Sequence, residues 1–141
     1  MVNIVQLIRR IERAAYPQVY WGLQDIESLE DVAEYVGCHV RDLVVLHGEN
    51  WYLLGSSTGE DFYIADLASA GGMGLKDLAQ VKELMLQHER VYMEARETTS
   101  YRLVKFMERR GLVSIMTDHP FEWGGEVFHE IELEIRRRRK V

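Results

Sequence analysis

Apolar residues in the first 40 positions recur at helical spacing and predict two helices. In the first helix, closed by Pro17, the polar side chains Arg9, Arg10, Glu12 and Arg13 are expected opposite an apolar face. That face consists of Ile4, Leu7, Ile8, Ile11 and Ala15. A second, short helix is predicted from a capping-box pattern at 28–31 and ends at Gly37.

From residue 42 onward the pattern changes to that of β-strands. Short apolar runs at 42–47, 51–55 and 62–68 are separated by turns, which predicts a three-stranded antiparallel meander. After a glycine turn at 71–74 the helical period returns. The apolar face of this helix is expected to contain Leu75, Leu78, Val81, Leu84 and Met85.

The last third of the chain alternates strands with one more helix. We expect a strand at 90–95, a helix at 99–110 stopped by Gly111, a strand at 112–116, a loop at 120–125 and a final strand at 127–135. The strand at 62–68 should pair in parallel with the strand at 90–95, because a helix connects them. These elements predict a single mixed α+β domain over 1–135 and a basic tail at 136–141.

Composition is that of a globular protein, with 47% apolar and 28% charged residues in 141. The apolar runs are too short to cross a membrane, and the N-terminus lacks the order of a secretory signal. We therefore expect a cytoplasmic protein with no membrane partner. The single cysteine, Cys38, excludes an intrachain disulfide.

Charge is unevenly distributed along the chain. The net charge is -6, but residues 136–140 supply five of the 17 basic residues, which leaves twelve against 23 acidic ones. An acidic body repels nucleic acid and favours cationic ligands. The sequence is also compatible with a homodimer.

Three segments resemble the GNAT acyltransferases: 11–17, 63–68 and 94–112. The order of elements is also similar, with the usual first strand shortened or missing. The resemblance implies a central, mostly antiparallel, splayed sheet flanked by about four helices. It also implies acetyl-CoA-dependent N-acyl transfer to a small-molecule or peptide amine.

The glycine turn is the first candidate site. Closely spaced backbone N–H groups at a helix N-terminus can bind a pyrophosphate, and the resemblance assigns this role to the turn for coenzyme A. Ser69 stands where the family usually has a basic or amide residue. The expected cofactor-binding residues are Leu67 and Ala68 on the strand and Gly72, Met73, Gly74 and Leu75 in the turn.

Two carboxylates are candidate general bases for the amine. Asp66 lies within an apolar run and Glu94 lies in the next strand; burial in a cleft would raise their pKa toward the working range. The family tyrosine that protonates the leaving thiolate falls at Met107, and core packing is expected for Phe106 and Met107. Other hydroxyls off this motif are Tyr63, Tyr92, Ser100 and Tyr101. The five histidines lack metal-ligand spacing, so no metal is expected.

Two other hypotheses remain. A GNAT-like domain without catalysis could serve as a binding, regulatory or phage structural protein, because the motif tyrosine is missing and the glycine turn is degenerate. A small antiparallel α+β binding domain unrelated to GNAT is the third. Measured turnover would distinguish the acyltransferase from the GNAT-like domain without catalysis. Two parallel central strands would argue against the unrelated α+β domain.

Overall fold

The computed structural model describes residues 3–17 and 22–136, so most of the basic tail lies outside the described residues. The N-terminal part contains two α-helices and two short 3-10 helices: α1 (Ile4–Ala15), η1 (Leu23–Asp25), α2 (Leu29–Val36) and η2 (Val40–Asp42). The remaining elements, in chain order, are β1 (Leu43–His47), β2 (Trp51–Thr58), β3 (Asp61–Ser69), α3 (Leu75–Leu86), β4 (Arg90–Arg96), α4 (Ser100–Arg109), β5 (Val113–Trp123) and β6 (Glu126–Ile135). No helix in this part of the chain is long and apolar enough to cross a membrane.

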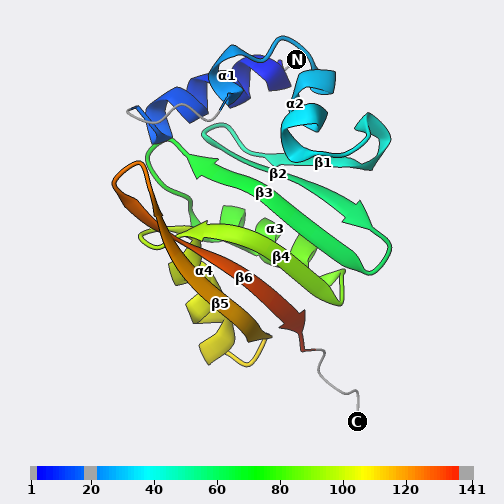
Figure 1. The fold of residues 1–141 in the computed structure, drawn as a ribbon, viewed down its shortest axis with the longest axis vertical. Helices are drawn as coiled ribbons and strands as arrows, with labels where there is room; N and C mark the ends of the chain where they lie inside the picture. Colours follow the sequence, from blue (N-terminus) through cyan, green and yellow to red (C-terminus); the bar gives the residue numbers. More distant parts are fainter. Residues whose placement is uncertain (1–2, 18–21, 137–141) are drawn as a thin grey trace.

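The six strands form one sheet in the order β1-β2-β3-β4-β6-β5 (Figure 1). Neighbouring strands are antiparallel except β3 and β4, which are parallel and joined by α3. The expected α+β class and the expected parallel central pair are thus confirmed.

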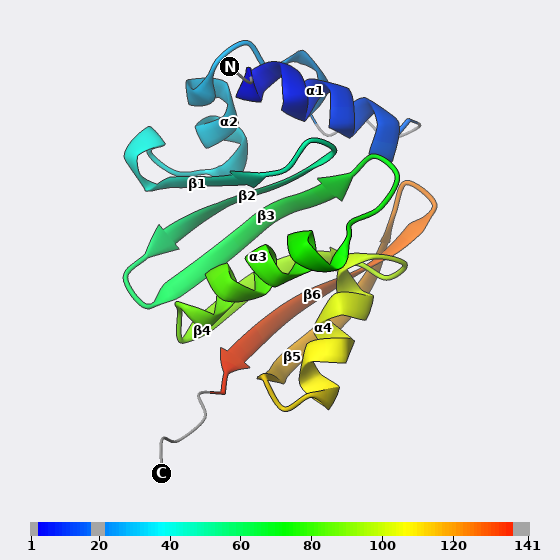
Figure 2. The same cartoon turned by 180° about the vertical axis from the view of Figure 1, so that it is seen from behind.

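The central pair separates halfway along its length. Among the described residues, β3 pairs with β4 only from Asp61 to Ile64, opposite 90–93. Beyond this point the two strands diverge in both views (Figures 1 and 2). The sheet is therefore splayed, as expected, and the second half of β3 and the end of β4 border the opening.

A β-bulge in β3 starts the separation. Leu54 pairs with Asp66 while the next residue, Gly55, pairs with Ile64, so Ala65 is the extra residue. A bulge reverses which face alternate side chains take. Ile64 packs on the side of α3, whereas Asp66 turns toward α1. A side chain at Gly55 would lie 2.2 Å from the Tyr63 carbonyl oxygen, so the bulge needs glycine here.

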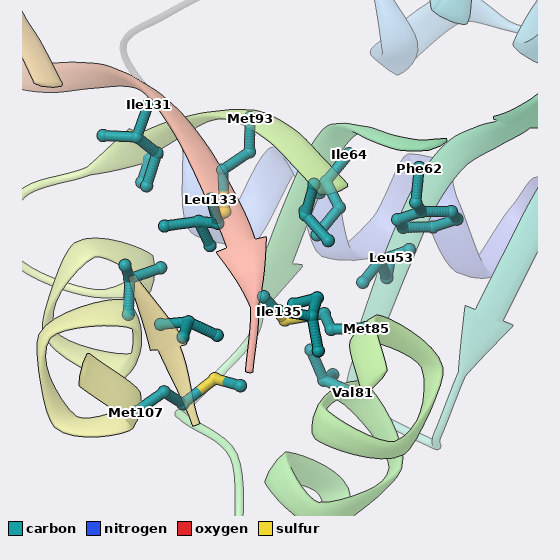
Figure 3. Packing of buried hydrophobic residues seen from close by; sticks show 14 of the residues in the cluster. Leu53, Phe62, Ile64, Val81, Met85, Met93, Met107, Ile131, Leu133 and Ile135 are labelled. Carbon is teal, nitrogen blue, oxygen red and sulfur yellow. The ribbon is translucent and has the colours of Figure 1, made fainter. Parts of the chain in front are cut away.

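Apolar side chains fill both faces of the sheet. Helices α3 and α4 cover one face (Figure 2). Their buried side chains include Val81, Met85 and Met107, which Figure 3 labels, and Val104. On the other face α1 and α2 cover β2 and the end of β3 through a second cluster, whose main members are Ile8, Ile11, Leu23, Val32 and Tyr52. The two clusters hold the splayed strands from opposite sides.

Three local expectations were wrong. Residues 120–123 continue β5, because Pro120 lies on an edge strand where its missing N–H costs no ladder bond; the turn is Gly124–Gly125, where both φ values are positive. Leu75 is 88% exposed because it begins α3 beyond the sheet. Phe106 is 45% exposed and lies under the Arg110 guanidinium rather than in the core.

Candidate functional site

Two cavities meet where β3 and β4 separate. The loop cavity has a volume of about 200 Å³ and lies between the end of β3, the glycine turn, α3 and α4. The acidic cavity has a volume of about 310 Å³ and lies between β3, β4 and the β5–β6 hairpin. Both cavities are lined by Tyr16, Leu67, Arg96 and Ser100, so they adjoin through the opening in the sheet.

Four of the six expected cofactor-binding residues line the loop cavity: Leu67, Ala68, Gly72 and Met73. Gly72 has a φ of +93° and Gly71 of +95°, a conformation that favours glycine and turns the chain sharply into α3. Gly74 and Leu75 follow directly but are outside the cavity lining. Their part in cofactor binding stays a prediction.

The N-terminus of α3 already carries an anion. The Gly74 N–H donates to Asp77 Oδ2 at 3.1 Å. Asp77 therefore occupies one of the amides expected to bind a pyrophosphate, and its negative charge sits at the positive end of the helix dipole. A phosphate on Gly74 would have to displace this carboxylate.

Both candidate bases line the acidic cavity. Burial raises the pKa of Asp66 above its ordinary value, although the Tyr52 hydroxyl, which donates at 2.7 Å, opposes that shift. Burial, and next the charge of Glu130, raises the pKa of Glu94. The structure thus brings together the two carboxylates that the sequence suggested, at a site where each is a stronger base than in water.

A third carboxyl group behind Asp66 was missed by the sequence analysis. Glu12, expected on the polar face of α1, is fully buried and hydrogen-bonded to the Tyr52 hydroxyl. A signal was present, since Glu12 stands four residues after Ile8 and one after Ile11, both in the core. Burial, and next the charge of Asp66, raises the pKa of Glu12 to about 9.

The hydroxyl groups are distributed differently from the family motif. Met107 is 1% exposed in the core, as expected, and lines neither cavity. Ser100, on the first turn of α4, lines both cavities. Tyr16 also lines both, although the sequence pattern did not indicate it as a proton donor. Tyr63 and Tyr92 line a separate hollow with Glu94 and Glu130 on the same sheet face.

Arg96 fixes the wall shared by the two cavities. Its Nε donates to Glu126 Oε1 at 2.8 Å, and its guanidinium lies 4.8 Å from the centre of the Tyr16 ring. Another of its nitrogens donates to the Ala15 carbonyl at 3.4 Å. These contacts link β4 to the end of α1 and leave the arginine charge matched by Glu126.

His129 belongs to a polar cluster beside α4. Its Nδ1 lies 2.7 Å from Asp118 and its Nε2 lies 3.3 Å from Glu97, while Tyr101 donates to Asp118 at 2.5 Å and stacks on the imidazole. His129 is therefore a buried side chain with a partner for each ring nitrogen. Tyr101 points to this cluster rather than into either cavity. Within residues 3–17 and 22–136, no group of three or more His, Cys, Asp or Glu side chains could hold a metal ion.

No protein-family model and no curated protein matches the chain by sequence. Solved structures do match its fold. The ribosomal-protein-S18-alanine N-acetyltransferase of Escherichia coli superposes with a TM-score of 0.61 and 12% identity, over 96% of this chain and 90% of that one.

Two further solved structures support the comparison. A putative GNAT-family acetyltransferase of Desulfovibrio desulfuricans gives a TM-score of 0.57 and 16% identity, over 94% of this chain and 92% of that one. A Bacillus subtilis acetyltransferase solved with CoA gives 0.50 and 12%, over 96% and 95%. Since the match spans nearly the whole chain in each case, this chain has the fold of the GNAT acetyltransferases.

Proposed function

We propose that the chain is an acetyl-CoA-dependent N-acyltransferase that acts on a cationic amine. The observation that supports this most is the position of Asp66. Its carboxyl group lines the acidic cavity, and that cavity adjoins the loop cavity through the split between β3 and β4. An acceptor on one side and a thioester on the other would meet beside a base.

The loop cavity fits the arm of coenzyme A in part. The edge of β3 after Ile64 has no β4 partner among the described residues, so its backbone groups can hydrogen-bond an extended ligand. Leu67, Ala68 and Met73 would contact the arm, and Gly72 to Leu75 would bind the pyrophosphate. When bound, the cofactor supplies an acyl group activated as a thioester.

The acidic cavity suits an amine. Its wall carries Asp66 and Glu94, and Arg96 is paired with Glu126 rather than left to repel a cation. Glu94 also lines the neighbouring hollow, where Tyr63, Tyr92 and Glu130 add two aromatic rings and another carboxylate. Cations are attracted to both kinds of group, so an acceptor with more than one positive charge is favoured.

Proton transfers in this mechanism are assigned to residues at the junction. Asp66 takes one proton from the ammonium form of the acceptor and later releases it to solvent. The neutral nitrogen forms a bond to the acyl carbon as the carbon–sulfur bond breaks. Ser100 or Tyr16 donates its hydroxyl proton to the sulfur and regains the second proton lost by the nitrogen.

The test is acetyl transfer from acetyl-CoA to a panel of polyamines, aminoglycosides and lysine peptides. Thiol release and the mass of the acetylated product are both measured. We expect turnover with at least one polycation, reduced in Asp66→Asn and in Ser100→Ala or Tyr16→Phe, but unchanged in the control Glu134→Gln on the exposed end of β6. Turnover that is indifferent to both Asp66 and Glu94 would refute the site assignment.

One observation favours a second candidate function, that of a binding or regulatory protein without catalysis. Asp77 occupies the Gly74 amide, which weakens the expected pyrophosphate site. No acetylated product from any amine in the panel, together with measurable coenzyme A binding, would support this alternative.

A further inference from the structure

The buried polar residues behind Asp66 form a chain with a definite hydrogen count. The Tyr52 hydroxyl lies 2.7 Å from Asp66 Oδ2 and also within hydrogen-bonding distance of Glu12 Oε2. A tyrosine hydroxyl carries one hydrogen and can donate to only one of these oxygens. The second contact is a hydrogen bond only if one carboxyl group is protonated and donates to the Tyr52 oxygen.

The surroundings of the two carboxyl groups decide which one holds the proton. Glu12 is fully buried, and its Oε1 has no hydrogen-bond partner within the described residues. A buried carboxylate with an unsatisfied oxygen is far more costly than a neutral carboxyl group. Asp66 borders the acidic cavity and also accepts a hydrogen bond from the Leu67 amide, which favours its ionised form.

We infer that Glu12 keeps a proton and donates it to Tyr52, which in turn donates to the carboxylate of Asp66, so that the negative charge of the pair faces the acidic cavity. In this arrangement Glu12 and Tyr52 are positioning residues and Asp66 is the group that meets the ligand. The catalytic consequence rests on the proposed function. The protonation pattern itself does not.

Other charges near the pair leave this assignment intact. The titratable groups that face it from the packed elements are Tyr16 at the end of α1, Tyr35 on α2, Tyr52 on β2, and Glu94 and Arg96 on β4. Burial, and next the charge of Asp66, raises the pKa of each of the three tyrosines, so they stay neutral. Arg96 is already ion-paired with Glu126.

The experiment is a carboxyl-carbon NMR titration of the ligand-free protein, labelled in the side-chain carboxyls of Asp and Glu. Glu12 should remain protonated through neutral pH and titrate near pH 9, while Asp66 titrates at lower pH. The signals are assigned by their loss in Glu12→Gln and Asp66→Asn. The titration itself is recorded on the parent protein, and ionisation of Glu12 together with Asp66 below pH 7 would overturn the inference.

Two variants test the hydrogen-bonded chain from Glu12 through Tyr52 to Asp66. Tyr52→Phe removes the donor to Asp66 and should raise its titration midpoint by about one pH unit, since a hydrogen bond to a charged group stabilises the charged form. Glu12→Gln keeps a neutral donor to Tyr52 and should leave the Asp66 midpoint unchanged. If the Asp66 titration midpoint does not shift in Tyr52→Phe, verified as folded by circular dichroism, the hydrogen-bonded chain from Glu12 to Asp66 is contradicted.

The same variants have a kinetic readout if the protein acetylates an amine. Tyr52→Phe should move the acid limb of the pH–rate profile to higher pH and leave the plateau rate similar, whereas Glu12→Gln should leave the limb in place. A purely structural role would lower the plateau without moving the limb, and that result would overturn the positioning role. If no amine is acetylated, the NMR titration still decides the protonation pattern, so the two proposals fail separately.

Discussion

The acidic cavity and the loop cavity differ in how completely their residues supply the expected chemistry. The acidic cavity has two carboxyl groups with raised pKa values and a buried hydrogen-bonded chain behind one of them. Next to the loop cavity, the Gly74 amide is taken by Asp77, and Arg96, which lines both cavities, is paired with Glu126. The residues present therefore fit the proposed proton transfers better than they fit the proposed pyrophosphate binding. We expect coenzyme A to bind with micromolar to millimolar affinity, or roughly -8 to -4 kcal/mol.

Loss of the base should have the largest effect. Asp66→Asn should lower the rate of acetyl transfer by about a hundred- to ten-thousand-fold, the usual range for general-base catalysis. Glu94→Gln should lower it by about tenfold, because Glu94 is shared between the acidic cavity and the neighbouring hollow and mainly attracts the cation. In the parent, activity should rise with pH as Asp66 loses its proton. Initial rates across a pH series measure this, and an equal loss in both variants would remove the distinction between the carboxylates.

A negative charge in the turn should weaken the loop cavity next. Gly74→Glu places a second carboxylate beside the expected pyrophosphate and should reduce coenzyme A affinity by at least about tenfold. Calorimetry at low and moderate salt measures the change. Ala79→Glu, on the exposed side of the same helix, is the matched control. If both variants bind coenzyme A as well as the parent, the turn is not the phosphate site.

The bulge that directs Asp66 into the acidic cavity should depend on Gly55. Gly55→Ala forces a methyl group against the Tyr63 carbonyl, 2.2 Å away, and should destabilise the fold by about 1–3 kcal/mol. Urea unfolding compares it with Ser56→Ala in the same strand. A fully stable Gly55→Ala protein would show that the strand relaxes without cost.

The buried acid should give stability an unusual pH dependence. The pKa of Glu12 is raised to about 9 in the folded chain, so its favourable contribution is complete below about pH 4 and is lost as pH rises toward 9. The slope can reach about 1.4 kcal/mol per pH unit for one proton. Glu12→Gln should flatten the fall in melting temperature between neutral and alkaline pH. An unchanged slope would show that Glu12 does not cause the pH dependence of stability.

The smallest effect should follow removal of the anion at α3. Asp77→Asn weakens the contact that occupies the Gly74 N–H and should raise coenzyme A affinity by about two- to fivefold, the equivalent of about 0.4–1 kcal/mol. Glu83→Gln, exposed on the same helix, removes the same charge elsewhere. An equal gain in both variants would indicate a general charge effect.

Much of the fold follows from local patterns in the sequence. The strand–turn–helix–strand order around Gly72 predicted the parallel central pair. The positions of Asp66 and Glu94 in two successive strands indicated that both could line one cleft, and both line the acidic cavity. The bulge at Ala65 could not be predicted, because it depends on contacts between Gly55 and the backbone of the facing strand. Glu12 was misplaced because a charged residue was assumed to face solvent.

The hydroxyl groups where the two cavities adjoin are another feature that local sequence patterns could not predict. Tyr16 and Ser100 are 84 positions apart in the chain, and they line the same two cavities only because the end of α1 and the start of α4 both border the opening in the sheet. Spacing along a helix could identify Met107 as the position of the missing tyrosine. It could not show which distant hydroxyl groups line the cavities.

Chemical-shift mapping of the amide signals tests most directly whether the two cavities divide the two substrates. With coenzyme A added, the largest shifts are expected at Leu67, Ala68, Gly72 and Met73. With spermidine added alone, they are expected around Asp66 and Glu94. Shifts from coenzyme A confined to residues outside the loop cavity, or spermidine shifts that spare both carboxylate strands, would contradict the assignment of the site.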